Sequence, residues 1–152
     1  MRPQTLSRAL FATLLATLGP LLLPASAAQD KGRPNTEPGR EVVTPSGVRY
    51  VDLRLGQGDE ASLGKIVEVH YVGWLEDGTR FDASRDQDRP LTFRLGAGDA
   101  LKGWDEGLAG MKVGGRRKLV IPPGLGFGKQ GVGSVVPPNA VLYYEFELLG
   151  VR

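Results

Sequence analysis

The residues best suited to chemistry lie in one short stretch, 70–86, which reads HYVGWLEDGTRFDASRD. It places the carboxylate of Asp82 directly after Phe81 and close in sequence to Tyr71, in a chain with no cysteine and one histidine. A carboxylate among apolar neighbours must either accept hydrogen bonds or change its pKa. Two interpretations of Asp82 remain open at this point: an ordinary surface turn residue, or a functional acid in an aromatic setting.

Hydrolytic chemistry finds little support in the sequence. His70, beside Glu68 by strand parity, is predicted to face away from Tyr71 and to be a solvated histidine. Ser84 and Ser134 then have no histidine on the face of the strand where one is needed, which argues against a Ser-His-acid triad. The acidic residues around the turn could include a glycosidase carboxylate pair, but a domain of this size leaves little room for a saccharide cleft.

Cofactor motifs are either absent or lack their structural context. Residues 126–131, GFGKQG, match the Gly-x-Gly-x-x-Gly expression, but prolines on both sides leave no helix to receive a pyrophosphate. No phosphate-binding loop of the Walker type and no metal-ligand spacing occurs, and the lack of cysteine excludes thiolate zinc sites. We therefore expect neither a metal nor a cofactor.

The segment 1–27 has the pattern of a secretory signal peptide. Arg2 and Arg8 precede an apolar run, and an Ala-Ser-Ala cleavage signature ends at residue 27. A transmembrane helix is the alternative, but the run is short and two prolines interrupt it. We expect export to a bacterial periplasm, with secretion to the medium as the alternative, and no membrane association after cleavage.

Charge and composition limit the partners of the mature chain. The formal net charge of +2, from 19 Lys and Arg against 17 Asp and Glu, falls to zero without residues 1–27, because that segment carries two arginines and no acid. A neutral chain has no electrostatic footprint for nucleic acid. Residues 28–41 are polar and rich in Pro and Gly, which predicts a flexible leader. Residues 42–152 are expected to form one domain.

The rest of the sequence consists of short alternating runs typical of strands. Strands are predicted at 48–55, 65–75, 80–83, 91–95, 116–121 and 141–149. Within residues 98–111, Leu101, Trp104, Leu108 and Met111 recur at helical spacing, with Asp99 available as a cap. The economical architecture is α+β: an antiparallel sheet of five to six strands with one short helix across its apolar face.

Strand parity brings several aromatic residues to one face of this sheet. In the last strand Leu142, Tyr144 and Phe146 occupy alternate positions, and in the second strand Val69 and Tyr71 do the same. Tyr71 and Tyr144 are therefore both predicted to face inward. They are either ordinary core aromatics or the lining of a cleft between sheet and helix, and parity alone leaves both open.

Three blocks, in this order and spacing, resemble the FKBP family of peptidyl-prolyl cis-trans isomerases: VHYVGWLEDGTRFDASRD, GWDEGLAGMKVGGRRKLVIPPGLGFG and VVPPNAVLYYEFELL. The resemblance covers roughly residues 44–151. It implies a half-barrel of antiparallel sheet wrapped around a short helix, and isomerisation of X-Pro bonds. That reaction crosses a barrier of about 18–20 kcal/mol because twisting destroys amide resonance, and it breaks no covalent bond. It therefore requires no nucleophile, metal or cofactor.

Carried over position by position, the resemblance implies two groups of site residues. The catalytic positions are Tyr71, Asp82, Phe127 and Tyr144. The substrate-binding positions are Phe81, Leu91, Phe93, Ala100, Leu101, Trp104, Val135 and Val136. By this resemblance Trp104 is the floor of the pocket beneath the proline ring. The backbone N–H of Leu101, in the first helical turn, is expected to be free to donate to a substrate carbonyl.

Some residues depart from the commoner family pattern. Phe127 stands where tyrosine is usual, and Gln87 stands where a basic residue often pairs with the equivalent of Asp82. In the other departures Leu91 replaces an aromatic, Ala100 a larger aliphatic, Val132 a frequent histidine and Tyr144 a phenylalanine. We expect these changes to affect substrate preference and macrolide affinity more than the activity itself.

The implied partners are X-Pro segments of unfolded or exported proteins, and macrolide inhibitors are further candidate ligands. We expect a monomer. A second hypothesis treats the same cleft as a binding module or chaperone for proline-containing segments, with little catalysis. Phe127 and Gln87 favour it, and exchange kinetics on a short peptide distinguish the two hypotheses.

Overall fold

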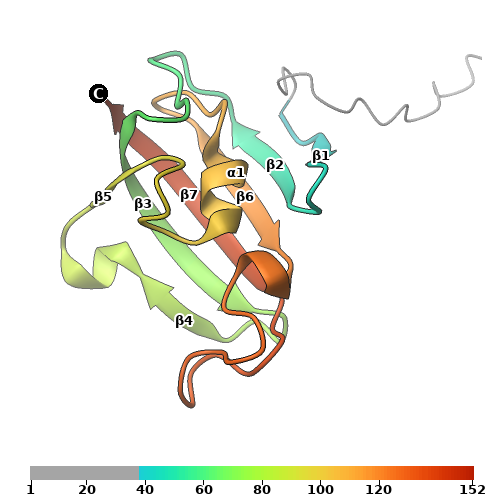
Figure 1. The fold of residues 1–152 in the computed structure, drawn as a ribbon. Helices are drawn as coiled ribbons and strands as arrows, with labels where there is room; N and C mark the ends of the chain where they lie inside the picture. The colour runs from blue at the N-terminus through green and yellow to red at the C-terminus, as the bar shows by residue number, and fades with distance from the viewer. Residues whose placement is uncertain (1–37) are drawn as a thin grey trace, which may run out of the picture.

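A computed structural model describes residues 38–152, which form an antiparallel sheet and one α-helix (Figure 1). The strands are β1 (Glu41–Val43), β2 (Arg49–Arg54), β3 (Ile66–Leu75), β4 (Arg80–Ala83), β5 (Leu91–Arg94), β6 (Arg116–Ile121) and β7 (Leu142–Val151). The helix α1 is Lys102–Leu108, and two 3₁₀ turns, η1 and η2, are Ser84–Gln87 and Pro123–Leu125. The predicted signal peptide and most of the predicted leader lie outside the described residues.

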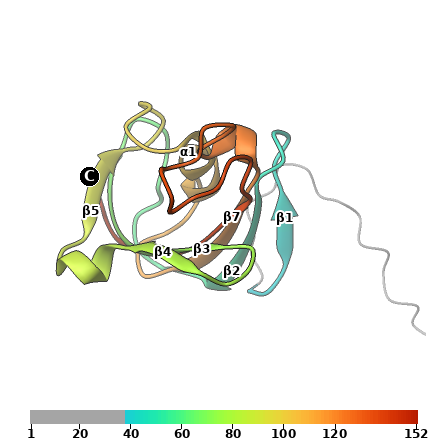
Figure 2. The ribbon, with the colours of Figure 1, turned by 90° about the horizontal axis from the view of Figure 1, so that it is seen from below.

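The long strand β3 carries two short strands on one edge. The strand order is β1-β2-β6-β7-β3-β4, and β5 also pairs with β3. The first part of β3, from Ile66 to Val69, pairs with β5, and a later part, from Val72 to Trp74, pairs with β4. Between β4 and β5 the chain passes through η1. The sheet curves around α1 as a half-barrel (Figure 2).

The predicted fold class is confirmed, since an antiparallel sheet wraps around one short helix. Within residues 38–152 the sheet has seven strands rather than five to six, because the unpredicted β1 pairs with β2. Gly39 already donates its N–H to the carbonyl of Asp52 at 2.8 Å. Ordered pairing therefore starts slightly ahead of residue 42, the predicted start of the domain. The other strands begin and end within two residues of their predicted bounds.

The helix α1 has a weak intrinsic propensity, and its packing against β6 holds it in place. Gly103 and Gly107 each cost about 1 kcal/mol of helix stability relative to alanine. An added Cβ at Gly103 would come within 2.5 Å of Ile121, and one at Gly107 within 2.2 Å of Leu119. The two glycines therefore let the helix backbone approach the sheet closely.

The helix starts later than its predicted cap. Leu101 is the N-cap residue, without a side-chain capping hydrogen bond. Asp99, predicted as the cap, instead accepts a hydrogen bond from the backbone N–H of Arg94 at 3.3 Å. Its carboxylate thus holds the turn that joins β5 to α1. The predicted inward face is confirmed for Trp104 and Leu108, and Met111, which follows the end of the helix, is buried as well.

The core lies between the concave face of the sheet and α1. The alternation predicted for β3 and β7 is observed, because Val67, Val69 and Tyr71 are buried, as are Leu142, Tyr144, Phe146 and Leu148. These residues form one cluster with the apolar side of the helix. Among residues 38–152, no helix has the length and apolar character needed to cross a membrane.

Candidate functional site

An irregularity in β4 brings two consecutive side chains to the helix side of the sheet. Asp82 is paired with Gly73 and Arg80 with Trp74, so Phe81 is the extra residue of a β-bulge. Phe81 packs against the core cluster, and the neighbouring Asp82 accepts a hydrogen bond from a core tyrosine. In a regular strand these two side chains would point to opposite faces.

Tyr71 and Asp82 form the polar centre of the site. The phenol of Tyr71 donates to Oδ2 of Asp82 at 2.7 Å. Burial raises the pKa of Tyr71, and the hydrogen bond and negative charge of Asp82 raise it further, so the phenol stays protonated near neutral pH. Within residues 38–152 no ion pair involves Asp82. The structure therefore favours the interpretation of Asp82 as an acid in an aromatic setting over its interpretation as an ordinary surface turn residue.

Trp104 lies at the centre of a group of aromatic rings. Its ring centroid is 4.9 Å from that of Tyr71, 5.0 Å from Tyr144 and 5.0 Å from Phe146, and Phe93 lies 5.9 Å away. The ring contacts with Tyr144 and Phe146 are edge-on, at 85° and 82°, the geometry that ring quadrupoles favour. The side chain of Trp104 is only 6 % exposed. An apolar, water-poor surface thus surrounds the Tyr71 phenol.

A second set of rings extends this cluster towards the loop after β6. The ring of Phe81 lies edge-on to Tyr144 at 5.6 Å and to Phe127 at 6.5 Å. Gly73 allows this approach, because a Cβ there would lie 2.7 Å from Tyr144 and 2.8 Å from Phe81. Four elements, β3, β4, α1 and β7, and the loop that carries Phe127 therefore meet at one group of rings.

Some hydrogen-bond donors at this group have no acceptor among residues 38–152. The buried indole Nε1 of Trp104 has none. The backbone N–H of Leu101, at the start of α1, also donates to no other described group. A buried donor without a partner costs about 1–3 kcal/mol, so such groups are uncommon outside binding sites.

Most of the remaining candidate residues pack with the hydrophobic core cluster that contains these rings. Leu91, Ala100 and Leu101 are partly buried against the core cluster, and Val136 is within it. Val135 differs, because it is 50 % exposed and makes no contribution to that cluster. The loop explains this, since Val132 and Val136 pair through two backbone hydrogen bonds, of 2.9 and 3.1 Å. Val135 therefore projects from the tip of a short closed turn.

A cavity of about 260 Å³ adjoins the edge of the cluster. Gln87 lines it from the end of η1, Arg89 and Pro90 from the segment that leads to β5, and Tyr71 and Leu91 from the sheet. The sequence departures at Gln87 and Leu91 therefore both face this cavity. They are well placed to affect which side chains fit beside the site.

Ser84 holds the backbone of Tyr71 in position and was missed as a site residue. Its buried Oγ accepts the N–H of Tyr71 at 2.8 Å and lies 2.9 Å from Nδ1 of His70. The prediction that Ser84 lacks a histidine partner is therefore wrong, because η1 folds back over β3. Ser84 is only 3 % exposed, and its oxygen is occupied by the Tyr71 backbone. The pair is thus poorly placed for nucleophilic attack.

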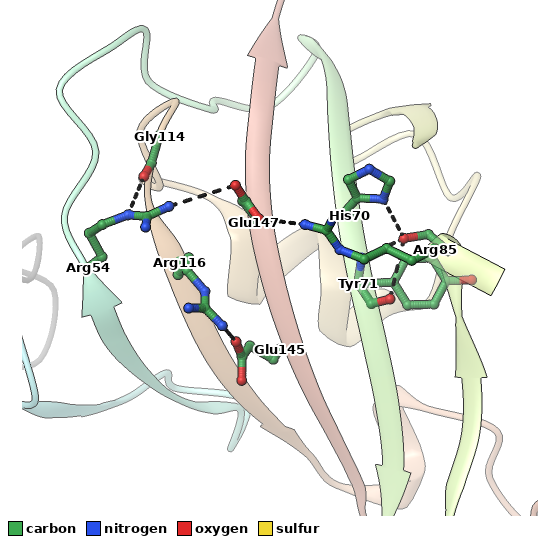
Figure 3. Close-up of polar contacts among 9 residues, drawn as sticks. Arg54, His70, Tyr71, Arg85, Gly114, Arg116, Glu145 and Glu147 are labelled. Atoms are coloured by element: carbon green, nitrogen blue, oxygen red, sulfur yellow. Dashed lines mark hydrogen bonds and ion pairs between the residues drawn. The ribbon is translucent and has the colours of Figure 1, made fainter. Parts of the chain in front are cut away.

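The outer face of the sheet, opposite α1, carries a ladder of charges (Figure 3). Glu147 lies between two guanidinium groups, 2.9 Å from that of Arg85 and 3.7 Å from that of Arg54. Arg116 pairs with Glu145 on the neighbouring strand. His70 faces this side, with Glu147 as its register partner, as strand parity predicts. Exposed pairs of this kind contribute about 0–1 kcal/mol each.

Two further residues of the ring group had a signal in the sequence. Phe146 contacts Trp104 and Tyr71, and its inward direction follows from parity, although it was not assigned to the site. Gly73 had a weaker signal, a glycine inside a strand, which often marks a close approach. No group of three or more His, Asp or Glu side chains that could hold a metal ion occurs in the described part of the chain.

Comparisons with known proteins identify the family. Residues 58–149 match the family model of the FKBP-type peptidyl-prolyl cis-trans isomerases. An FK506-binding protein of Neisseria meningitidis serogroup B is 55 % identical over 105 residues, which cover 69 % of this chain and 96 % of that relative. A chloroplastic peptidyl-prolyl cis-trans isomerase of Arabidopsis thaliana, FKBP13, is 43 % identical over 119 residues, 71 % of this chain and 57 % of that protein.

Solved structures agree with this assignment. The crystal structure of AtFKBP13 has a TM-score of 0.70 at 40 % identity and covers 74 % of this chain and 99 % of that one. FkpA from Escherichia coli has a TM-score of 0.68 at 41 % identity and covers 74 % of this chain and 51 % of that one. The chain therefore belongs to the FKBP-type peptidyl-prolyl cis-trans isomerase family. Its enzymatic activity is that of a peptidyl-prolyl cis-trans isomerase.

Proposed function

We propose that this isomerase rotates X-Pro bonds of exported proteins at the ring group around Trp104, without covalent chemistry. The observation that carries the proposal is the Tyr71–Asp82 hydrogen bond, held against the indole ring of Trp104. An X-Pro bond needs only to be desolvated and twisted. Polar groups fixed among apolar rings can orient a peptide for that rotation without attacking it.

The rate enhancement follows from a difference in polarity between the two states of the bond. Resonance makes the planar imide more polar than the twisted one. An apolar surrounding therefore disfavours the planar ground state relative to the transition state. Hydrogen bonds that form only in the twisted geometry add to this difference. A nucleophile would contribute nothing to either effect.

Each site residue has a role in this proposal. Trp104 supports the proline ring, and the other rings exclude water from its sides: Phe81, Phe93, Phe127 and Tyr144. The Leu101 N–H donates to the substrate carbonyl, and the Tyr71 ring, whose hydroxyl is bonded to Asp82, helps to orient that carbonyl. Asp82 supplies local negative charge without transferring a proton. The aliphatic residues contact the peptide around the proline: Leu91, Ala100, Val135 and Val136.

The role of Asp82 is tested by NMR exchange on a short X-Pro peptide. We expect Asp82→Ala to lower kcat about tenfold, equivalent to about 1.4 kcal/mol, with a smaller change in KM. Asp86→Ala is the matched control, because its carboxylate is exposed and pairs only with Arg80 at 3.2 Å. An Asp82→Ala variant with unchanged kcat would refute the role assigned to this carboxylate.

A chaperone role is the second candidate, and two residues favour it. Phe127 lacks a hydroxyl at the rim of the ring group, and Gln87, beside the cavity, carries no positive charge that could pair with Asp82. Each change removes a polar group that could contact the peptide while its X-Pro bond rotates. The same exchange experiment decides, because a protein that only binds proline segments would slow the interconversion rather than accelerate it.

Export and macrolide binding complete the proposal. The signal pattern of residues 1–27 supports processing on export, and one relative is named chloroplastic, so the family also occurs inside an organelle. N-terminal sequencing of the chain after expression in a bacterial host is expected to begin at Ala28. Relatives are named FK506-binding proteins, and we expect FK506 to compete with the peptide in the exchange assay.

A further inference from the structure

One cross-strand row places Tyr144 opposite Asp82. Gly73 on β3 pairs with Asp82 on β4 and with Tyr144 on β7, so the three residues lie side by side on the helix face of the sheet. Neighbouring strands are about 4.7–4.9 Å apart, and the central residue of this row has no side chain. The phenol of Tyr144 and the carboxylate of Asp82 therefore border the same small space.

The hydroxyl of Tyr144 lacks a hydrogen-bond acceptor in the described part of the chain, although this side chain is only 1 % exposed. The indole N–H of Trp104 is close enough to affect the phenol oxygen, but its geometry does not complete a hydrogen bond. The proton of the phenol is thus left without an acceptor. Buried hydroxyls normally have one, so this group is available to a bound molecule.

Near neutral pH the hydroxyl keeps its proton and can donate it in a hydrogen bond. Burial raises the pKa of Tyr144, and the charge of Asp82 and the neighbouring Tyr71 raise it further. The phenol therefore remains neutral and cannot serve as a base. Phenylalanine, the commoner residue at this position by family resemblance, would offer the same ring without the donor.

The X-Pro bond itself offers an acceptor that exists only during rotation. The proline nitrogen carries no hydrogen. In the planar bond its lone pair is delocalised into the carbonyl, and in the twisted bond the lone pair is localised on nitrogen. A donor directed at that nitrogen therefore binds the transition state and not the ground state, which is the condition for raising kcat.

We propose that the Tyr144 hydroxyl donates a hydrogen bond to the proline nitrogen when the X-Pro bond leaves planarity. The inference rests on the proposed function, because that function seats the proline ring on Trp104. Tyr144 is edge-on to the indole at 5.0 Å and 85°, so its ring packs directly against the side chain on which the pyrrolidine would sit. This contact makes Tyr144 a catalytic residue through its hydroxyl and not only through its ring.

The test compares Tyr144→Phe with Tyr143→Phe. Tyr143 is the next residue on β7, and its side chain faces the opposite side of the sheet, so this variant removes a hydroxyl without touching the site. In NMR exchange on an X-Pro peptide we expect Tyr144→Phe to lower kcat about tenfold with unchanged KM. We expect Tyr143→Phe to match the wild type. Tyr144→Phe keeps the ring and removes no hydrogen bond to an acceptor in the described part of the chain, so it should fold, which its urea midpoint checks.

Several outcomes would overturn the inference. One is an unchanged kcat in a folded Tyr144→Phe protein. Another is a raised KM at constant kcat, which would mean that the hydroxyl binds a carbonyl in both states of the bond. A wild type that fails to accelerate exchange would overturn the proposed function, a result distinct from the others.

Discussion

The two ends of helix α1 differ in how completely their polar groups are paired. At the carboxyl end, Arg117 and Asp52 form an ion pair that is 3 % and 2 % exposed, with contacts of 2.6 and 3.1 Å. The same guanidinium donates to the carbonyls of Gly107 at 2.9 Å and Ala109 at 3.2 Å. The ring of Tyr50 lies 4.1 Å from it. We call Asp52, Arg117 and Tyr50 the ion-pair end.

The opposite region consists of Trp104, Tyr71 and Tyr144 with Leu101 at the start of the helix, and we call it the ring end. Here the Nε1 of Trp104 and the N–H of Leu101 have no acceptor within residues 38–152. A buried charge left without its partner would be costly, and at the ion-pair end all three guanidinium nitrogens of Arg117 are bonded. The comparison indicates that one end fixes the helix and the other keeps its donors for a ligand.

Breaking the ion pair is expected to have the largest effect. Asp52→Ala leaves the Arg117 charge buried without its partner, which typically costs 3–5 kcal/mol, read as a lower urea midpoint. We expect the fraction that folds to keep its kcat/KM. Arg49→Ala is the control, because its pair with Glu41 is exposed at 3.7 Å and should contribute about 0–1 kcal/mol. An Asp52→Ala variant with the wild-type urea midpoint but a lowered kcat/KM would contradict the different roles assigned to the two ends.

Filling the gap between the rings is expected to have the next largest effect. Gly73→Ala places a Cβ 2.7 Å from Tyr144 and 2.8 Å from Phe81, so both rings must move. Overpacking of this kind costs about 1–3 kcal/mol. Unlike Asp52→Ala, this variant should also lower kcat/KM, because the displaced rings border the substrate. Gly124→Ala, where an added Cβ meets nothing within 4 Å, is the control for both measurements.

Removing a ring is expected to affect binding more than folding. Phe81 is only partly buried, and in the proposed complex it covers apolar surface of the proline ring, which contributes about 25 cal/mol for each Å² covered. Phe81→Ala should therefore raise KM roughly tenfold, as exchange measurements at several peptide concentrations would show. A large loss of stability at constant KM would instead make Phe81 part of the fixed core.

Much of the ring end could be predicted from the sequence, because strand alternation is a property of the backbone. It placed Tyr71, Tyr144 and Phe146 inward, and all three are buried. The bulge at Phe81 could not be predicted in this way, since it depends on the register with β3. Strand parity also could not predict that η1 folds back over β3 and brings Ser84 to His70.

The ion-pair end was beyond prediction for a different reason. Asp52 and Arg117 are 65 positions apart, and only the pairing of β2 with β6 brings them together. Both residues look like ordinary surface charges in an alternating strand. The outward direction of Val135 was also not predictable, because the backbone bonds between Val132 and Val136 determine it. Periodicity describes one segment at a time, so it could not predict these contacts between distant segments.

The smallest expected effect is an alkaline slope that differs between the two ends. The pKa of Tyr71 is raised in the folded chain by burial and by Asp82, whereas at Tyr50 burial raises the pKa and Arg117 opposes it. An unfolded tyrosine ionises near pH 10, so above that pH the unfolded state loses protons that the folded state retains, and stability falls as pH rises. Urea unfolding between about pH 9 and 11 should show this slope. Tyr71→Phe should flatten it more than Tyr50→Phe, and the reverse order would mean that the Asp82 charge does not act on Tyr71.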